Sequence, residues 1–151
     1  MKKLFSIFFI AAMLSMALVS CGDDDEPNVP ESQTLESLYL EPTDTHFLFD
    51  IDLEKDSSSI YLYNAIFTIG EEHSPAMNIR IDAPVSVDKS GKIFTYAGTD
   101  IIPFLLRGNT PTPMPSFLVT NLTCTVNTAD KTYSMFFNCH GGEYSNSGKL
   151  K

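Results

Sequence analysis

Two aspartates offer the spacing in this chain that is best suited to chemistry. Asp50 and Asp52 lie two residues apart in the alternating segment His46–Leu53, so a strand would place both carboxylates on one face. Paired carboxylates can bind calcium or share acid and base roles. They more often mark the hydrated side of a strand, and this is the interpretation that we expect here.

The other reactive side chains do not form a recognisable site. The histidines are His46, His73 and His140, and none has the spacing to a second ligand that a zinc site requires. Cys139 and His140 are adjacent, so a strand directs them to opposite faces. The chain has no Gly-x-Ser-x-Gly, no His-Glu-x-x-His and no phosphate-binding glycine loop. We therefore expect no catalytic residue, metal site or cofactor. A hydrolase is the least supported of the functions that we consider.

The beginning of the chain has the three parts of a secretory signal. Lys2 and Lys3 precede an apolar run from Leu4 to Val19, and small residues follow at Ser20 and Cys21. The run is shorter than the ~20 residues of a membrane-spanning helix. The pattern therefore favours a cleaved signal over residues 1–20 rather than a retained membrane helix.

The segment Leu18-Val19-Ser20-Cys21 resembles the lipobox of bacterial lipoproteins. The resemblance implies cleavage before Cys21, diacylation of its thiol and acylation of the new amino group. Such an anchor would hold the protein firmly, because two or more acyl chains bind a bilayer stably at ~0.8 kcal/mol per buried CH₂. The alternative is an ordinary secreted protein in which Cys21 pairs with another cysteine.

An acidic tether follows the cysteine. Asp23 to Glu26 are four consecutive carboxylates, and the residues after them are polar with two prolines, so we expect residues 21–35 to form a disordered tether. The acidic cluster resembles the export signal of Bacteroidota surface lipoproteins. That resemblance implies the outer face of the outer membrane, and the periplasmic leaflet is the alternative.

The net charge excludes one large class of partner. The whole chain has a formal charge of −9, and residues 36–151 have 14 acidic and 8 basic residues, which leaves −6. A domain this acidic is not expected to bind nucleic acid, which requires clustered Lys and Arg.

Residues 36–151 read as a single all-β domain. Runs rich in Val, Ile, Phe, Tyr and Thr recur between Gly, Pro, Asn and Asp, and no amphipathic helix is evident. We expect about eight antiparallel strands that form a small barrel or a two-sheet sandwich. Three prolines in Thr110–Pro115 predict an extended crossing or rim loop there. The expected strands are 46–53, 59–69, 77–82, 93–97, 101–106, 117–126, 132–139 and 143–149, and for 101–106 one helical turn is the alternative.

Three segments resemble the calycin-like (lipocalin-like) small lipoproteins of Bacteroidota. They are Met77-Asn78-Ile79, Lys92 to Gly98 and Gly148-Lys149-Leu150. The resemblance implies a small β-barrel with a small apolar ligand in its mouth or interior. Tyr61, Tyr63 and Phe67 fall on one predicted face of strand 59–69, and they either line such a ligand site or pack in the core.

The remaining cysteines are Cys124 and Cys139, in a compartment that permits disulfides. A hairpin that turns near Ala129 would pair residue 139 with about residue 119, which separates the two cysteines by roughly 16 Å at ~3.3 Å per residue. A disulfide requires Cα atoms within about 7 Å. We therefore predict two unpaired, buried thiols.

These observations predict a lipid-anchored protein of the cell envelope whose domain is a non-catalytic binding module. Its membrane contact would be through acylated Cys21, and its ligand is a small apolar molecule or a protein. The alternative is a structural or accessory subunit that docks through an exposed strand edge or the proline-rich segment.

Overall fold

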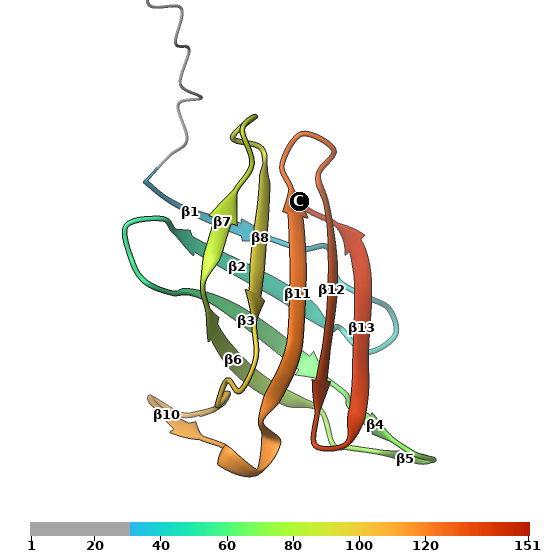
Figure 1. Ribbon diagram of the computed structural model, residues 1–151. Coiled ribbons are helices and arrows are strands. Elements are labelled where there is room, and N and C mark those ends of the chain that lie inside the picture. The colour runs from blue at the N-terminus through green and yellow to red at the C-terminus, as the bar shows by residue number, and fades with distance from the viewer. Residues whose placement is uncertain (1–30) are drawn as a thin grey trace, which may run out of the picture.

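The protein is built almost entirely of antiparallel strands. The computed structural model describes residues 31–151, which contain thirteen strands, one short 3₁₀ helix and no α-helix (Figure 1). In this part of the chain, no helix is long and apolar enough to cross a bilayer. The expected signal segment, Cys21 and most of the tether lie outside the described residues.

The first sheet has six strands in the order β1-β2-β3-β6-β9-β10, and all neighbours are antiparallel. Its strands are β1 (Ser32–Glu36), β2 (His46–Asp52), β3 (Ser58–Ala65), β6 (Met77–Ala83), β9 (Phe104–Arg107) and β10 (Thr110–Pro113).

The second sheet has five strands in the order β13-β12-β11-β8-β7, again antiparallel. A separate two-stranded hairpin, β4 (Thr68–Ile69) with β5 (Glu72–His73), lies beside β13 at the edge of the second sheet, and the 3₁₀ helix η1 covers Pro115–Phe117. The strands of the second sheet are β7 (Val85–Val87), β8 (Ile93–Gly98), β11 (Val119–Asn127), β12 (Thr132–Cys139) and β13 (Gly142–Lys149).

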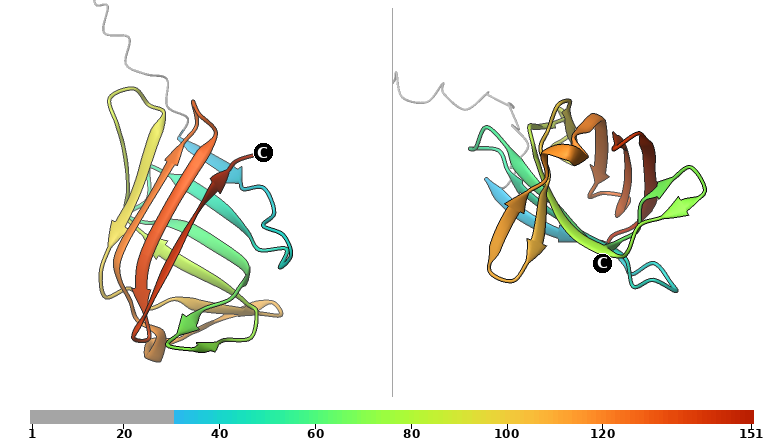
Figure 2. Two further views of the ribbon diagram at one scale, coloured as in Figure 1. Left: turned by 90° about the vertical axis from the view of Figure 1, so that its right-hand side faces the viewer. Right: turned by 90° about the horizontal axis from the view of Figure 1, so that it is seen from below.

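The two large sheets pack face to face. Figure 1 shows the strands of the first sheet crossing behind those of the second at a steep angle, and Figure 2 shows the two layers from the side and from below. Pro84 links β6 to β7, so the chain passes from one sheet to the other at this corner. The all-β, antiparallel prediction is confirmed, and of the two architectures left open the structure has the two-sheet sandwich rather than a closed barrel.

Period-two alternation builds the core. Phe47, Phe49 and Ile51 of β2 are fully buried, while the residues between them face outward. The same alternation buries one side of β3, β6, β8, β11 and β12, and the resulting core contains 22 buried apolar residues. The space between the sheets is therefore filled by side chains.

Tyr96 joins the two layers. Its ring, from β8 of the second sheet, is fully buried against Phe49 of the first. Its hydroxyl donates to the backbone carbonyls of Asp50 (3.2 Å) and Ser59 (3.5 Å), so a buried polar group has partners. Burial raises the pKa of Tyr96 far above its ordinary value, and the thiol of Cys124 and the carboxylate of Asp50 act in the same direction.

Several short strands were not predicted. The structure has thirteen strands where about eight were expected, because β1, β4, β5, β7 and β10 have only two to five residues and show too few alternations to be recognised. The tether boundary is also corrected. Ser32–Glu36 forms β1 and pairs with β2, so residues 32–35 belong to the sheet and not to a disordered tether.

The proline-rich segment is a second correction. Thr110–Pro113 is not a loop but the outermost strand of the first sheet, where it pairs with β9. A proline at this position is tolerated because one side of an edge strand has no ladder partner that needs its missing N–H. The loop expectation holds only for Met114, which precedes η1, because Pro115 is the first residue of that helix.

Asn64 changes the face that the following residues occupy. The pairing of β3 with β6 shifts between Leu62 and Ala65, and Asn64 has a φ of 53°, a left-handed conformation that asparagine tolerates. Its N–H donates to the side-chain oxygen of Asn78 at 2.9 Å. Tyr61 therefore faces outward while Ala65, four residues later, is buried. The predicted single strand 59–69 is in fact two strands: β3, which contains this irregularity near its end, and β4, which begins at Thr68.

Both cysteines of the domain are free and buried, as predicted. Cys139 lies opposite Val119, as expected, and Cys124 pairs in register with Met135. Burial raises the pKa of Cys139 to about 11 and raises that of Cys124 further. Both side chains are therefore protonated packing groups at neutral pH.

Substitution of Phe49 tests the packing of the core. Phe49→Ala should lower the free energy of unfolding by about 3–5 kcal/mol, because the ring is fully buried between the sheets. Phe136→Ala, which removes a ring that is 37% exposed on the outer face of the second sheet, should cost at most about 1 kcal/mol. Urea denaturation measures both values, and equal losses would contradict the assigned core.

Candidate functional site

The outer faces of the two sheets differ in composition. On the second sheet, one row of directly paired residues consists only of hydroxyl side chains, the usual composition of a face in contact with water. On the first sheet, the corresponding row carries two rings, a leucine and an arginine. The hydroxyl row is Ser86, Thr95, Thr125, Ser134 and Ser147, and the mixed row is Glu36, Leu48, Tyr61, Arg80, Phe104 and Pro113.

Rings continue this mixed row along the first sheet. Tyr63 and Tyr61 are nearly parallel, with centroids 6.3 Å apart and planes at 7°. His46 stacks on Tyr63 at 4.8 Å, and Tyr39, in the loop after β1, packs on His46 at 4.5 Å. Tyr39 is 47% exposed and the other rings are half-buried. We call these rings, together with Phe104, the aromatic strip (Tyr39, His46, Tyr61, Tyr63 and Phe104).

Arg80 occupies the position between Tyr61 and Phe104. It lies directly opposite Tyr61 on one side and opposite Phe104 on the other. Its guanidinium carbon lies 4.6 Å from the centre of the Phe104 ring, within the range of a cation–π interaction. Its terminal nitrogen pairs with Asp82 at 3.0 Å, while its Nε is buried without a hydrogen-bond partner.

Ion pairs neutralise most of the charge on this face. Besides the pair of Arg80 with Asp82, Lys151 pairs with Glu36 at 2.6 Å and also lies 4.7 Å from the centre of the Tyr39 ring. Lys55 pairs with Asp52 at 2.7 Å. Among residues 31–151, Asp50 has no cation partner, so its carboxylate remains open to a ligand.

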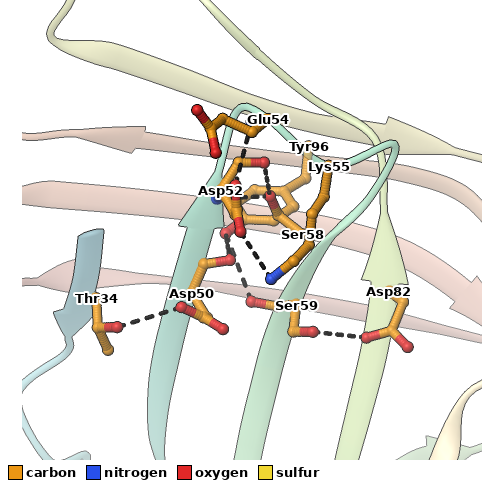
Figure 3. Close-up of polar contacts among 9 residues, drawn as sticks. All are labelled: Thr34, Asp50, Asp52, Glu54, Lys55, Ser58, Ser59, Asp82 and Tyr96. Carbon is orange, nitrogen blue, oxygen red and sulfur yellow. Dashed lines mark hydrogen bonds and ion pairs between the residues drawn. The ribbon is translucent and has the colours of Figure 1, made fainter. Parts of the chain in front are cut away.

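A polar row runs beside the aromatic strip. It consists of directly paired residues of β1, β2, β3 and β6, and Figure 3 shows their side chains. The Thr34 hydroxyl donates to Asp50 at 3.2 Å, and the Ser59 hydroxyl donates to Asp82 at 2.7 Å. We call this set the polar row (Thr34, Asp50, Ser59 and Asp82).

The two aspartates that the sequence singled out share this face, but each has its own environment. Asp52 is held by Lys55 and by the N–H of Glu54, and the bond from Lys55 is the main cause of its lowered pKa. Asp50 is held only by Thr34. Across residues 31–151, no three His, Cys, Asp or Glu side chains are placed to hold a metal ion together.

The three aromatic residues predicted to share one face do not do so. Tyr61 and Tyr63 belong to the aromatic strip, but Phe67 follows the break at Asn64 and is buried against Phe137 and Tyr144. The prediction that Phe67 shares a face with the two tyrosines is therefore wrong. Its position is that of a core residue, whereas the two tyrosines lie on the side of the sheet away from the core.

Other members of the site were missed in the sequence. Tyr39, Leu48, Arg80 and Phe104 were not singled out, and His46 was considered only as a metal ligand. The alternation in β2 and β6 places Leu48 and Arg80 on the outer face, and this signal is visible in the sequence. That the two residues flank Tyr61 depends on the pairing of β2, β3 and β6, which no local pattern shows.

The other two histidines lie away from this face. His73 in β5 contacts the hydroxyl of Thr68 at 3.0 Å. His140 stacks on Phe117 at 4.6 Å, and its Nδ1 lies 2.9 Å from the carbonyl of Ser116. Each has a local structural partner.

A pocket of about 250 Å³ lies along the free edge of β13. β13 is the last strand of its sheet, so one side of its backbone has no ladder partner. Ser37 and Leu38 cover one end of that edge. The N–H of Leu38 donates to the carbonyl of Lys149, and Ser37 forms an antiparallel bridge with Leu150. The pocket walls are Leu40, Thr43, Thr45, Ile66, Thr68, Glu143, Tyr144, Ser145 and Asn146.

The arrangement on the first sheet offers groups that can bind a ligand. Half-exposed rings offer flat apolar surfaces with polar edges, and the neighbouring hydroxyls and carboxylates offer hydrogen bonds. Comparison of the chain with protein-family models, curated proteins and solved structures finds no match.

Titration of Tyr63 tests the packing of the strip. Burial raises the pKa of Tyr63 above its ordinary value of 10.0, and Tyr61 and Glu36 raise it further. Tyr61→Phe should therefore lower the pKa of Tyr63, because it removes a neighbouring group that becomes negative at the same pH. Tyr39→Phe is the matched control and should leave that pKa unchanged. NMR of the Tyr63 ring carbons measures it, and equal effects of the two variants would contradict the geometry.

Proposed function

We propose that this protein is a lipid-anchored module of the cell envelope that binds its ligand, without catalysis, on the outer face of the first sheet. The observation that carries the proposal is the contrast between the two outer faces. One has a full row of hydroxyl residues, and the other has stacked rings across adjacent strands. Half-exposed aromatic groups gathered on one face are typical of binding surfaces.

The packing of the interior supports this location. The sequence-based expectation was a small apolar ligand inside a barrel, but the space between the sheets is occupied by Phe47, Phe49, Tyr96, Phe137 and their neighbours. A ligand there would have to displace closely packed core side chains, which is costly. The outer face requires no such rearrangement.

The absence of catalysis in the proposal is supported by how two of the three aspartates on this face, Asp52 and Asp82, are engaged. Asp52 and Asp82 are each held by a cation and by a further hydrogen bond. General acid or base catalysis requires a group that is free to exchange a proton with the substrate and whose pKa is tuned near the working pH. The lowered pKa of Asp52 moves it away from that range.

The anchor rests on the sequence. The basic start, the apolar run and Cys21 resemble a bacterial lipoprotein signal, and the acidic residues after Cys21 resemble a surface-export signal. We propose the outer membrane, with the domain facing the outside of the cell, and the periplasmic leaflet is the alternative.

The second candidate is an accessory subunit that docks through β13. The free edge of this eight-residue strand and the pocket beside it favour this function, because an extended segment of a partner can add to such an edge. The edge is partly covered at one end by Leu38, which leaves only its middle residues free.

Labelling with radioactive palmitate tests the anchor. The wild-type protein should incorporate label and remain with membranes, and Cys21→Ala should lose both properties, because the thiol is the proposed attachment point. The matched control is Cys124→Ala, which removes a buried thiol of the domain and should keep the label. Label that survives in Cys21→Ala would contradict the anchor.

Hydroxyl-radical footprinting tests the binding face. The purified protein is oxidised alone and after mixing with envelope extract of the source organism. Tyr61 and Tyr63 should become protected by at least several-fold, while the 37% exposed Phe136 on the other sheet should not change. Protection at residues 143–147 of β13 without protection of the tyrosines would favour the accessory-subunit function instead.

A further inference from the structure

We propose that the ligand of this face is an uncharged glycan, whose sugar rings stack on Tyr61 and Tyr63 and whose hydroxyls bond to the polar row. This inference rests on the proposed function and names the ligand class of the same site. Three features of the face carry it, namely the geometry of the rings, the position of the carboxylates and the balance of charge.

The rings provide flat surfaces for the apolar faces of sugars. A pyranose ring has C–H groups on its faces and hydroxyls on its rim, so it stacks on an aromatic ring while its rim remains free to hydrogen-bond. Tyr61 and Tyr63 are parallel to within 7° and side by side on one strand, and His46 is tilted by only 18° to Tyr63. Because His46 stacks on Tyr63 at 4.8 Å, these two rings cover each other in part, and we assign the sugar contacts to the half-exposed parts of Tyr61 and Tyr63.

The polar row supplies the groups that sugar hydroxyls need. Asp50 and Asp82 lie on the two strands beside Ser59, which is two residues from Tyr61 on β3. A carboxylate is an acceptor with two oxygens and can hold two neighbouring hydroxyls. Within residues 31–151, the Asp50 carboxylate accepts one side-chain hydrogen bond, from Thr34 at 3.2 Å, and pairs with no cation, so it retains acceptor capacity beside the rings.

The charge of the face favours a neutral ligand. Its three cations, Lys55, Arg80 and Lys151, are each paired with a carboxylate of the same face, so no free cation is offered to an acidic ligand. The unpaired Asp50 would repel an anion. Because phosphate and uronate groups need unpaired Lys or Arg, nucleic acids and acidic polysaccharides fit this surface poorly.

Affinity electrophoresis with full-length protein tests the inference. The gels contain amylopectin, mixed-linkage β-glucan, galactomannan or xylan as neutral probes, and polygalacturonate as the charged probe. At least one neutral probe should retard the wild type, and polygalacturonate should not. Tyr61→Ala combined with Tyr63→Ala should weaken that binding on the order of tenfold or more, since two stacking contacts are lost.

Two further variants separate the effects of binding from those of folding. Phe136→Ala, on the opposite face, should bind like the wild type. Asp50→Asn keeps the size of the side chain and an acceptor oxygen, and it should weaken binding with an unchanged unfolding midpoint. If the double tyrosine variant does not fold, the binding of Asp50→Asn and of Tyr61→Leu is compared with that of the wild type instead, and both should bind more weakly. Equal retardation of every folded variant and the wild type would overturn the inference.

Treatment of the envelope extract distinguishes this inference from the proposed function. Periodate cleaves neighbouring diols of sugars, and protease removes proteins. Protection of Tyr61 and Tyr63 in the footprint should disappear after periodate and survive protease. Protection that survives periodate and disappears after protease would overturn the glycan and leave a protein ligand on the same face. No protection by untreated extract would overturn the proposed function itself.

Discussion

The alternation of side chains along β2, β3 and β6 is the constraint on which the rest of the structure depends. One side of these strands must fill the space against the second sheet, and it does so with Phe47, Phe49, Ile60, Leu62, Ile79 and Ile81. The buried Tyr96 hydroxyl fixes the second sheet to the carbonyls of Asp50 and Ser59 at the centre of this contact. Because the core side is complete, the large aromatic groups of the other side cannot be explained by packing between the sheets.

This division separates the stabilising core from the face that we propose as the binding surface. The interior has the close packing and satisfied polar groups of a stabilising core, and a change there affects the whole domain. The outer face of the first sheet has rings, paired charges and one carboxylate without a cation, and these affect only what lies on the surface. The outer face of the second sheet has the hydroxyl row and one isolated exposed ring, that of Phe136, in place of a continuous strip of rings.

Sequence patterns predicted the parts of this structure that depend on local alternation. The strand His46–Asp52, the strand Thr132–Cys139 and the outward position of Asp50 and Asp52 follow from period-two patterns, and the distance between Cys124 and Cys139 follows from the register of one hairpin. The short strands were not predicted because two to five residues show too little alternation of apolar and polar side chains. The predicted face of Phe67 was wrong because a single residue in the left-handed conformation, Asn64, shifts the register of strand pairing. The aromatic strip joins residues from four separate segments, so only the pairing of strands shows it.

The most direct test of the account is an NMR titration of protein with ¹³C-labelled tyrosine rings against the polysaccharide fraction of envelope extract. The account predicts that the ring signals of Tyr61 and Tyr63 shift in proportion to occupancy, and that those of the buried Tyr96 and Tyr144 remain in place. Shifts of Tyr96 without shifts of Tyr61 and Tyr63 would contradict it, because they would place the ligand between the sheets.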